Sequence, residues 1–142
     1  MLSQKTRYAL RALLHLAEAE PGRSVQAAEI AAAQQVPRKY LELILLDLKK
    51  AGFIASRRGP GGGYVLARPA TDISFADVLR ATEGPIALVP CASINFYARC
   101  GDCHDEASCA IRRVMAQVRE DAVRTLSGTS LADAAAFETL AA

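Results

Sequence analysis

A run of five residues with almost no side chains, Gly59 to Gly63, is the feature that most restricts how this chain can fold. The segments on either side, residues 53–58 and 64–67, carry the apolar and aromatic residues typical of short strands. We therefore expect a two-stranded hairpin with a nearly bare tip. A phosphate-binding loop of a nucleotide enzyme would instead open a helix and place Lys-Ser/Thr after its last glycine. Here Tyr64-Val65-Leu66 follows, which excludes that class of enzyme.

Three helices are predicted ahead of this hairpin. Apolar residues at helical spacing place them at residues 3–19, 27–34 and 37–50. Ser24 is expected to cap the second helix, and Gly52 is expected to lie just past the end of the third. Only a tight turn separates the second helix from the third.

The third helix has distinct faces. Its apolar residues follow the i, i+3, i+4, i+7 pattern of a core face, and they are Leu41, Ile44, Leu45 and Leu48. Its polar side chains fall on other sides, with the donors concentrated near the N-terminal end: Arg38, Lys39, Glu42 and Lys49. Two helices joined by a tight turn, the second presenting polar side chains from its first turn, match a DNA-reading helix-turn-helix. The alternative is an ordinary three-helix core with a solvated polar face.

The predicted hairpin has the position of a wing, because it directly follows the helix-turn-helix. A tip without side chains lets the backbone around Gly61 approach a phosphate or enter a narrow groove, and Arg57 and Arg58 supply positive charge at its base. The overall charge agrees with this interpretation. Residues 1–70 hold eleven Lys/Arg against five Asp/Glu, whereas residues 71–142 hold six against ten. A basic front half indicates a polyanion partner, and the alternative is a solvated basic surface without one.

The second half is predicted to be helical around one long loop. Ser74 should cap a helix over residues 75–82, and Asp105 should cap a long helix that ends near Leu126. The apolar stripe of that long helix consists of Ile111, Met115, Val118, Ala122 and Leu126. Its spacing suits packing along a partner helix, and a second copy of the chain is the economical partner because the rest of the chain is already committed. A short last helix is expected over residues 129–137.

All four cysteines lie within nineteen residues, at Cys91, Cys100, Cys103 and Cys109. Thiolates gathered in this way can hold an iron–sulfur cluster or zinc, can form a redox switch, or can be inert. The N-terminus has no unbroken apolar stretch and the chain has no membrane-spanning run, so we expect a cytoplasmic protein with no membrane partner, in which disulfides are disfavoured. Neither a nucleophile–base pair nor an acid pair stands out, so an enzyme is not expected.

Three features together resemble one family. They are the N-terminal segment from Leu2 to Ala9, the stretch from Tyr40-Leu41-Glu42 to the RGPGGGY run at residues 58–64, and a cysteine loop before a long helix. Over about residues 1–135 the chain resembles the dimeric winged-helix regulators typified by IscR, NsrR and RirA, which bind iron–sulfur clusters. That resemblance implies operator DNA as a partner, with the third helix in the major groove and the wing arginine in the minor groove. The implied DNA-contacting residues are Arg38, Lys39, Tyr40 and Glu42 on the third helix, Arg58 in the wing, and Ser3, Gln4, Thr6 and Arg7 near phosphates.

The cysteines depart from the family pattern of three. Cys103 and Cys109 match the usual gap of five residues between the last two cysteines, which implies Cys91, Cys103 and Cys109 as ligands of a 2Fe–2S or 4Fe–4S cluster. Cys91, Cys100 and Cys109 form an equally regular set. Some relatives carry a histidine three residues after the last cysteine, where this chain has Arg112. The fourth ligand is then the spare cysteine, His104 or a carboxylate such as Asp105.

The sequence therefore predicts a mainly α protein with a small β-hairpin wing. A winged helix-turn-helix domain over residues 1–84 is followed by a cysteine-rich cluster loop over 85–108, and by a dimerisation helix and tail over 109–142. The predicted function is that of a homodimeric transcriptional repressor whose DNA affinity depends on an iron–sulfur cluster that senses iron, nitric oxide or redox state. The alternative is a DNA-binding regulator that uses thiol oxidation or zinc.

Overall fold

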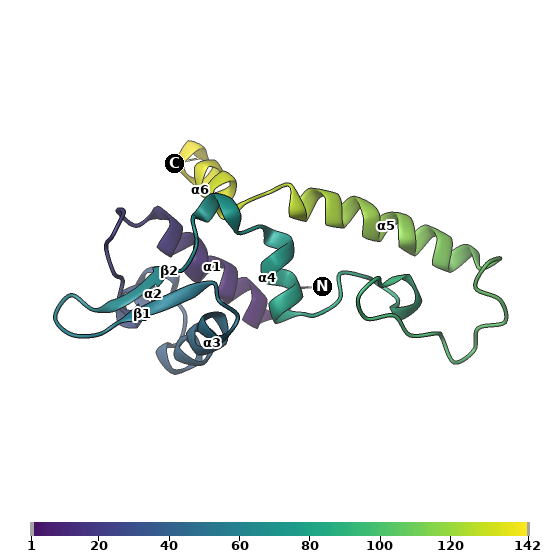
Figure 1. The fold of residues 1–142 in the computed structure, drawn as a ribbon, viewed down its shortest axis with the longest axis horizontal. Helices are drawn as coiled ribbons and strands as arrows, with labels where there is room; N and C mark the ends of the chain where they lie inside the picture. The colour runs from purple at the N-terminus through teal and green to yellow at the C-terminus, as the bar shows by residue number, and fades with distance from the viewer. Residues whose placement is uncertain (1, 142) are drawn as a thin grey trace.

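Three helices form the first part of the fold, α1 (Gln4–Glu18), α2 (Ala27–Gln34) and α3 (Arg38–Lys50), in a computed structural model that describes residues 2–141 (Figure 1). Ser3 caps α1, because its hydroxyl accepts a hydrogen bond from the backbone N–H of Thr6 over 3.1 Å. Gln35 ends α2 in the left-handed conformation, with φ 53°, and Pro37 caps α3. These residues produce the tight turn that was predicted between the two helices.

The apolar core lies among these three helices. The predicted core face of α3 is confirmed, since Leu41, Ile44, Leu45 and Leu48 are all buried. They pack with the buried face of α1 and with Ile30 of α2 and Ile54 of the hairpin. One further fully buried side chain, Leu131, comes from the C-terminal helix α6 (Leu131–Ala141), which packs against α1.

The hairpin consists of β1 (Ile54–Arg57) and β2 (Gly63–Leu66), which pair antiparallel with Ile54 opposite Leu66 and Arg57 opposite Gly63. Tyr64 also exchanges two backbone hydrogen bonds with Val25, at 2.9 and 2.7 Å, so the segment before α2 pairs with β2. A Cβ atom on Gly63 would lie 2.5 Å from the Val25 carbonyl oxygen. The fold itself therefore requires a glycine at residue 63, whatever the hairpin tip touches.

The second half contains the short 3-10 turns η1 (Ala70–Asp72) and η2 (Pro90–Ala92), and the helices α4 (Phe75–Thr82), α5 (Ala110–Ser127) and α6. The predicted cap of α4 is confirmed: the Ser74 hydroxyl accepts from the Asp77 N–H, and the Asp77 carboxylate accepts from the Ser74 N–H, each over 3.1 Å. This reciprocal arrangement is a capping box, which fixes where α4 begins.

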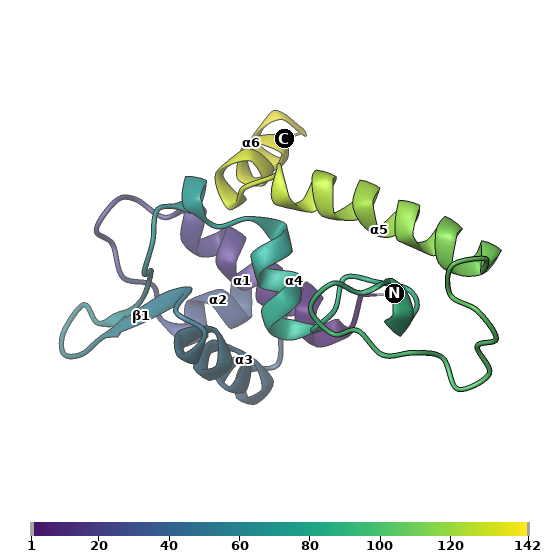
Figure 2. The same cartoon turned by 45° about the vertical axis from the view of Figure 1, so that its right-hand side comes forward.

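The hairpin and the cysteine loop lie at opposite ends of the molecule (Figures 1 and 2). α5 runs from the cysteine loop back toward the body, where α6 covers α1. α5 contacts α4 and η2, yet none of its residues is buried. Its stripe residues Ile111 and Val118 are exposed, in agreement with a helix that has an open apolar face.

Some boundaries predicted from the sequence are wrong. Gln26, not Ser24, precedes α2, and its side chain makes no capping hydrogen bond. Cys109, not Asp105, caps α5, while Asp105 accepts hydrogen bonds from the backbone of Ala107 and Ser108 within the preceding loop. The last helix begins at Leu131 and extends further than predicted. The fold class, mainly α with a small β-hairpin wing, is confirmed, and among residues 2–141 no helix has the length and apolar character needed to span a membrane.

Candidate nucleic-acid interface and cysteine site

The start of α3 presents its polar side chains to solvent. Arg38, Lys39 and Glu42 are exposed, and the Arg38 Nε donates to Glu42 Oε1 over 3.1 Å. Tyr40 is half-buried and packs edge-on against Tyr8 of α1, with 5.8 Å between the ring centroids. The first turn of α3 is thus tied to α1, while its charged groups remain free to approach a partner. The Arg38–Glu42 pair is solvent-exposed, so it opposes rearrangement only weakly.

The N-terminal residues of α1 divide into exposed and buried ones. Ser3, Gln4 and Arg7 are exposed, and the Gln4 side-chain amide donates to the Tyr8 hydroxyl over 2.8 Å. Thr6 is fully buried, and its hydroxyl donates to the Thr82 hydroxyl of α4 over 2.8 Å. The Thr6 side chain therefore has no surface from which to reach a phosphate, and it holds α1 against α4 instead.

The two wing arginines differ in what they contact. The Arg57 guanidinium donates to the Gly22 carbonyl oxygen over 2.8 Å, which ties β1 to the turn after α1. Arg58 is exposed, and so is Gly61 at the tip, which has a φ of 74° and open space around its Cα. Both arginines are exposed, and the Arg57 guanidinium in addition ties the hairpin to the turn after α1.

Two exposed side chains of α3 escaped the sequence-based prediction. Leu43 and Leu46 point to solvent from the middle of the helix, on the side away from the core. The signal was present in the sequence, because both leucines fall outside the i, i+3, i+4, i+7 set that forms the core face. An apolar residue in an apolar helix usually belongs to the core, so residue type alone does not predict the exposure of these two leucines.

The four cysteines line one cavity of about 330 Å³ between the loop and the first turn of α5, together with His104, Asp105 and Arg112. Cys91 is buried on η2, and the other three cysteines are partly exposed. The Cys100 thiol donates to the Cys91 sulfur over 3.7 Å. This hydrogen bond, together with desolvation and nearby negative charge, raises the pKa of Cys100 above its ordinary value. The backbone N–H of Cys103 donates to the Cys100 carbonyl, which closes a turn across the CxxC segment.

Positive and donor groups surround this cavity. Cys109 caps α5 with its sulfur, which accepts from the Arg112 N–H over 3.4 Å. The Arg112 Nε donates to the Cys91 carbonyl over 3.1 Å, and Arg99 donates to the carbonyls of Cys103 and His104. Guanidinium groups and a backbone N–H of a helix N-terminus therefore lie beside the cysteines of this cavity.

The donor set fits an iron–sulfur cluster or zinc in its chemistry, because four sulfur donors share one cavity. Within residues 2–141, however, no three potential ligands converge on one point at coordination distance. The loop thus gathers potential sulfur ligands around one cavity, and among residues 2–141 they do not form a complete coordination site.

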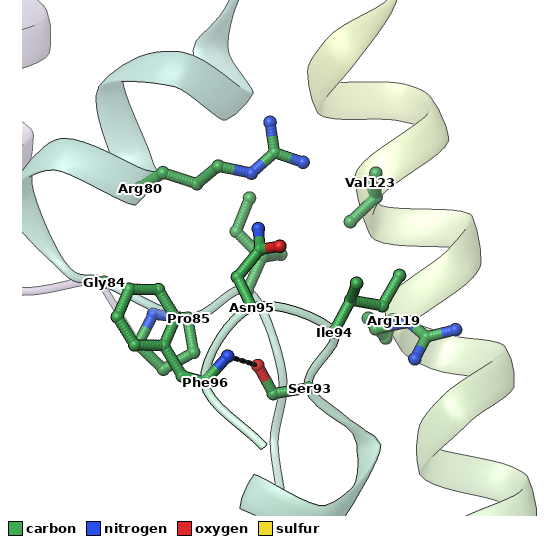
Figure 3. Close-up of a pocket in the computed structure, with 10 residues that line it drawn as sticks. Arg80, Gly84, Pro85, Ser93, Ile94, Asn95, Phe96, Arg119 and Val123 are labelled. Atoms are coloured by element: carbon green, nitrogen blue, oxygen red, sulfur yellow. Dashed lines mark hydrogen bonds between the residues drawn. The ribbon is translucent and has the colours of Figure 1, made fainter.

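A second cavity, of about 210 Å³, lies between the end of α4, the loop after η2 and α5 (Figure 3). The Ser93 hydroxyl on its wall accepts from the Phe96 N–H over 3.0 Å. Arg119 of α5 lines the same cavity and donates to the Ala92 carbonyl. With Arg112 bonded to Cys91, two arginines one heptad apart on α5 hold η2 in place.

The loop that carries the cysteines begins where α4 meets the N-terminus of α1. Glu83, the residue after α4, accepts the Ser3 backbone N–H through Oε1 over 2.6 Å. The nearby Thr6 and Ser3 hydroxyls, together with the Ser3 backbone N–H, hold the pKa of Glu83 below its ordinary value of 4.5. Hydrogen bonds therefore connect η2 to α5, and they connect the end of α4 to the N-terminus of α1.

Comparisons with known proteins agree with this geometry. Residues 2–136 match the family model described as Rrf2, iron-dependent transcriptional regulator. An rrf2-like HTH-type transcriptional regulator of Rhodobacter capsulatus is 50% identical over 121 residues, which cover 83% of this chain and 81% of that protein. An HTH-type transcriptional regulator of Mycobacterium tuberculosis, Rv1287, is 39% identical over 134 residues, covering 94% of this chain and 80% of that protein.

Solved structures give the same result. CymR, described as the global cysteine regulator of B. subtilis, superposes with a TM-score of 0.80 at 29% identity, over 96% of this chain and 97% of that one. IscR of T. potens has a TM-score of 0.74 at 28% identity, over 94% and 84% of the two chains. The oxidized form of CymR from Staphylococcus aureus has a TM-score of 0.69 at 30% identity, over 95% of each chain.

Proposed function

The chain belongs to the Rrf2 family of DNA-binding transcriptional regulators, which are not enzymes, and we propose that it is a homodimeric repressor whose DNA affinity depends on an iron–sulfur cluster held by its cysteine loop. The observation that carries this proposal is the cavity lined by all four cysteines at the start of α5. A cluster that responds to iron supply, nitric oxide or oxidation would make this regulator a sensor of those conditions.

The residues proposed to hold the cluster are Cys91, Cys103 and Cys109, with Cys100 as the fourth ligand or a spare thiol. Cys91 and Cys109 have the best-defined surroundings, because Arg112 contacts both: its side chain donates to the Cys91 carbonyl and its backbone N–H donates to the Cys109 sulfur. Arg99 and Arg112 would offset the negative charge of the thiolates. Since three ligands do not yet converge on one point among residues 2–141, binding would have to order the loop.

A change in that loop has a direct route to the DNA-contacting elements. Arg112 and Arg119 connect η2 to α5, α5 packs against α4, and α4 is bonded to the N-terminus of α1 through Thr82 and Glu83. α1 in turn packs against α3. Ordering of the loop would therefore change the position of α5 relative to α3, and a coupling of about 1–3 kcal/mol is enough to change DNA affinity 5- to 150-fold.

The proposed DNA interface combines three elements. The major groove would be contacted by the first residues of α3, which are Arg38, Lys39, Tyr40 and Glu42. Arg58 of the wing would enter the minor groove, with Gly61 close to the DNA backbone. Phosphates would be contacted from the start of α1, by Ser3, Gln4 and Arg7. Support comes from the exposure of the charged members of this set and of the tip glycine. Arg57 is assigned a supporting role, because its guanidinium is bonded to the Gly22 carbonyl.

Dimerisation is proposed along α5. None of its residues is buried within one chain, and Ile111, Val114 and Val118 are exposed, so the helix has an apolar face that a single copy leaves open to solvent. Pairing with the same helix of a second copy would bury this face. It would also place two winged units on successive half-sites of an operator.

A second candidate function, sensing by thiol oxidation, is favoured by the distance between two cysteine sulfurs. The Cys91 and Cys100 sulfurs lie only 3.7 Å apart, so a peroxide could oxidise the two thiols to a disulfide with little movement of the chain. A regulator that senses thiol oxidation would use this pair and would need no metal. Zinc in the same cavity is the other form of this alternative.

The deciding experiment is anaerobic purification followed by quantification of iron, inorganic sulfide and zinc, with visible and EPR spectra. The proposal predicts iron and sulfide in the wild-type protein. Replacement of Cys91, Cys103 or Cys109 by alanine should remove both, whereas Cys100→Ala tests whether that thiol is spare. Colourless protein without iron and sulfide would contradict the cluster, and stoichiometric zinc or a Cys91–Cys100 disulfide after peroxide treatment would favour the alternative.

A further inference from the structure

We infer that Leu43 and Leu46 of α3 read thymine methyl groups in the major groove, so that the operator carries thymines at the two positions facing them. This inference rests on the proposed role of α3 as the reading helix, and it names what the middle of that helix recognises.

The side of α3 opposite the core is a single stripe. Lys39, Leu43, Leu46 and Lys50 follow one another at spacings of four, three and four residues, which places them on one face of a helix. The core residues Leu41, Ile44, Leu45 and Leu48 occupy the other face and are buried. Leu43 is 62% exposed and Leu46 is 47% exposed, so neither side chain belongs to the core of the monomer.

The order of side chains along this stripe specifies its partner. Two leucines are flanked by a lysine on each side, so the surface offers an apolar centre between two positive charges. A purely apolar protein partner would leave Lys39 and Lys50 buried without counter-charges, which is costly. The major groove of DNA offers the complementary order, with phosphates at both edges and the C5-methyl groups of thymine on its floor.

The dimensions agree with direct reading of bases. An α-helix with its side chains is about 10–12 Å across, and the major groove is about 12 Å wide, so the residues farthest from the core reach the base edges. Leu43 and Leu46 are separated by a rise of about 4.5 Å along the helix, and base pairs are spaced about 3.4 Å apart. The two leucines therefore face base pairs one or two steps apart.

A leucine can make no hydrogen bond, so its preference comes from apolar contact with a methyl group. Cytosine presents an amino group and guanine presents acceptors at the corresponding places, and each would lose water without gaining a partner against a leucine. Arg38, Lys39 and Glu42 at the start of α3 are the residues able to read hydrogen-bonding groups. The helix thus divides into a polar reading segment and an apolar one.

The test uses deoxyuridine, which lacks only the C5-methyl group of thymine. High-affinity duplexes are first selected from a random library with the wild-type protein, and each thymine of the selected site is then replaced singly by deoxyuridine. The inference predicts two positions at which the wild-type protein loses affinity about fourfold, the factor that corresponds to the burial of one methyl group. Leu43→Ala should abolish the loss at one of these positions, and Leu46→Ala at the other.

Leu140→Ala is the matched control, because Leu140 is an exposed leucine of α6, a helix that lies apart from α3 and the hairpin (Figure 1). It should keep both deoxyuridine effects, and all three variants should melt at the wild-type temperature. A selected site without such thymines, or deoxyuridine effects that persist in Leu43→Ala and Leu46→Ala, would overturn the inference while leaving the DNA-binding role intact. If no sequence is selected, or if sites are bound equally well when Arg38 and Lys39 are replaced by alanine, the use of α3 as the reading helix fails as well.

Discussion

The winged half of the molecule and its cysteine half are built on different principles. α1, α2, α3 and the hairpin share one continuous core, to which α4 and α6 also contribute buried side chains. Between residues 85 and 127, by contrast, only Cys91, Ala92 and Ser93 are buried, and all three lie on or next to η2. The first half thus takes its shape from its own side chains. The second half has three partly exposed thiols and a helix with an exposed apolar face, and under the proposed function a cluster and a second copy of the chain would cover them.

The largest effect expected from this contrast is on stability, at two adjacent leucines of α3. Leu45→Ala should lower the free energy of unfolding by about 2–5 kcal/mol, because Leu45 is fully buried and its truncation leaves a cavity. Leu46→Ala, one residue further on, should change it by less than about 0.5 kcal/mol because that side chain is exposed. Urea titrations followed by circular dichroism measure both values. Similar losses at the two positions would mean that α3 is packed differently.

The cysteine half is tested through α5. Val118→Asp should convert the dimer to a monomer at micromolar concentration, with a loss of about 2 kcal/mol or more typical of a central interface residue. The melting of the winged core should change little, because Val118 is not part of it. Gln117→Asp is the control on a neighbouring exposed position of the same helix. Analytical sedimentation measures the oligomeric state of both variants. A Val118→Asp variant that remains dimeric would place the dimer interface elsewhere.

Substitutions of the two wing arginines are expected to have different effects, one on DNA binding and the other on the stability of the fold. Arg58→Ala should weaken DNA binding about five- to tenfold and reduce the slope of log affinity against log salt by about one, because one cationic contact is lost. Its unfolding free energy should stay at the wild-type value. Arg57→Ala should instead lose about 1 kcal/mol of stability together with the hydrogen bond to Gly22. Affinity titrations at several salt concentrations, paired with urea melts, check both. A stability loss in Arg58→Ala would reverse the assignment.

The smallest effect is a pH dependence at the junction of α1 and α4. The pKa of Glu83 is lowered in the folded protein by the nearby Thr6 and Ser3 hydroxyls and by the Ser3 backbone N–H. Its contribution to stability is therefore complete above the ordinary glutamate pKa of 4.5, and it is lost as pH falls through the lower folded value. Because Glu83 is exposed, we expect less than about 1 kcal/mol. Wild type and Glu83→Gln should differ at pH 7 and converge near pH 3, and a constant difference would contradict this account.

Much of the winged half could be predicted from sequence, because local signals and packing agree there. The core face of α3, the Ser74 cap and the hairpin all follow from spacing and residue type. The misses have physical causes. Asp105 is a better capping residue than Cys109 in general, yet Asp105 is used within its own loop, so helix α5 begins four residues later than a cap at Asp105 would place it. The burial of Thr6 depends on α4, which lies far away in sequence.

For the cysteine site, the sequence predicts which residues take part but not how they are arranged. Spacing alone favoured neither the 91–103–109 set nor the 91–100–109 set, and the structure places Cys100 beside Cys91 while all four thiols share the cavity. Between residues 94 and 109 no side chain is buried, so packing contributes little to the conformation of that part of the loop. Leu43 and Leu46 illustrate the opposite case, since their spacing already marked them as lying outside the core face.

The most direct test of the central claim is the affinity for one selected operator, measured on a single anaerobic preparation before and after removal of its iron and sulfide, at fixed salt. If a cluster held by the cysteines controls DNA binding by the winged half, removing it should change the operator affinity about tenfold or more. The variant Cys109→Ala should then have the affinity of the stripped protein in every measurement. Equal affinities of the loaded and stripped forms would show that the cysteine half does not control the winged half, and would contradict the account.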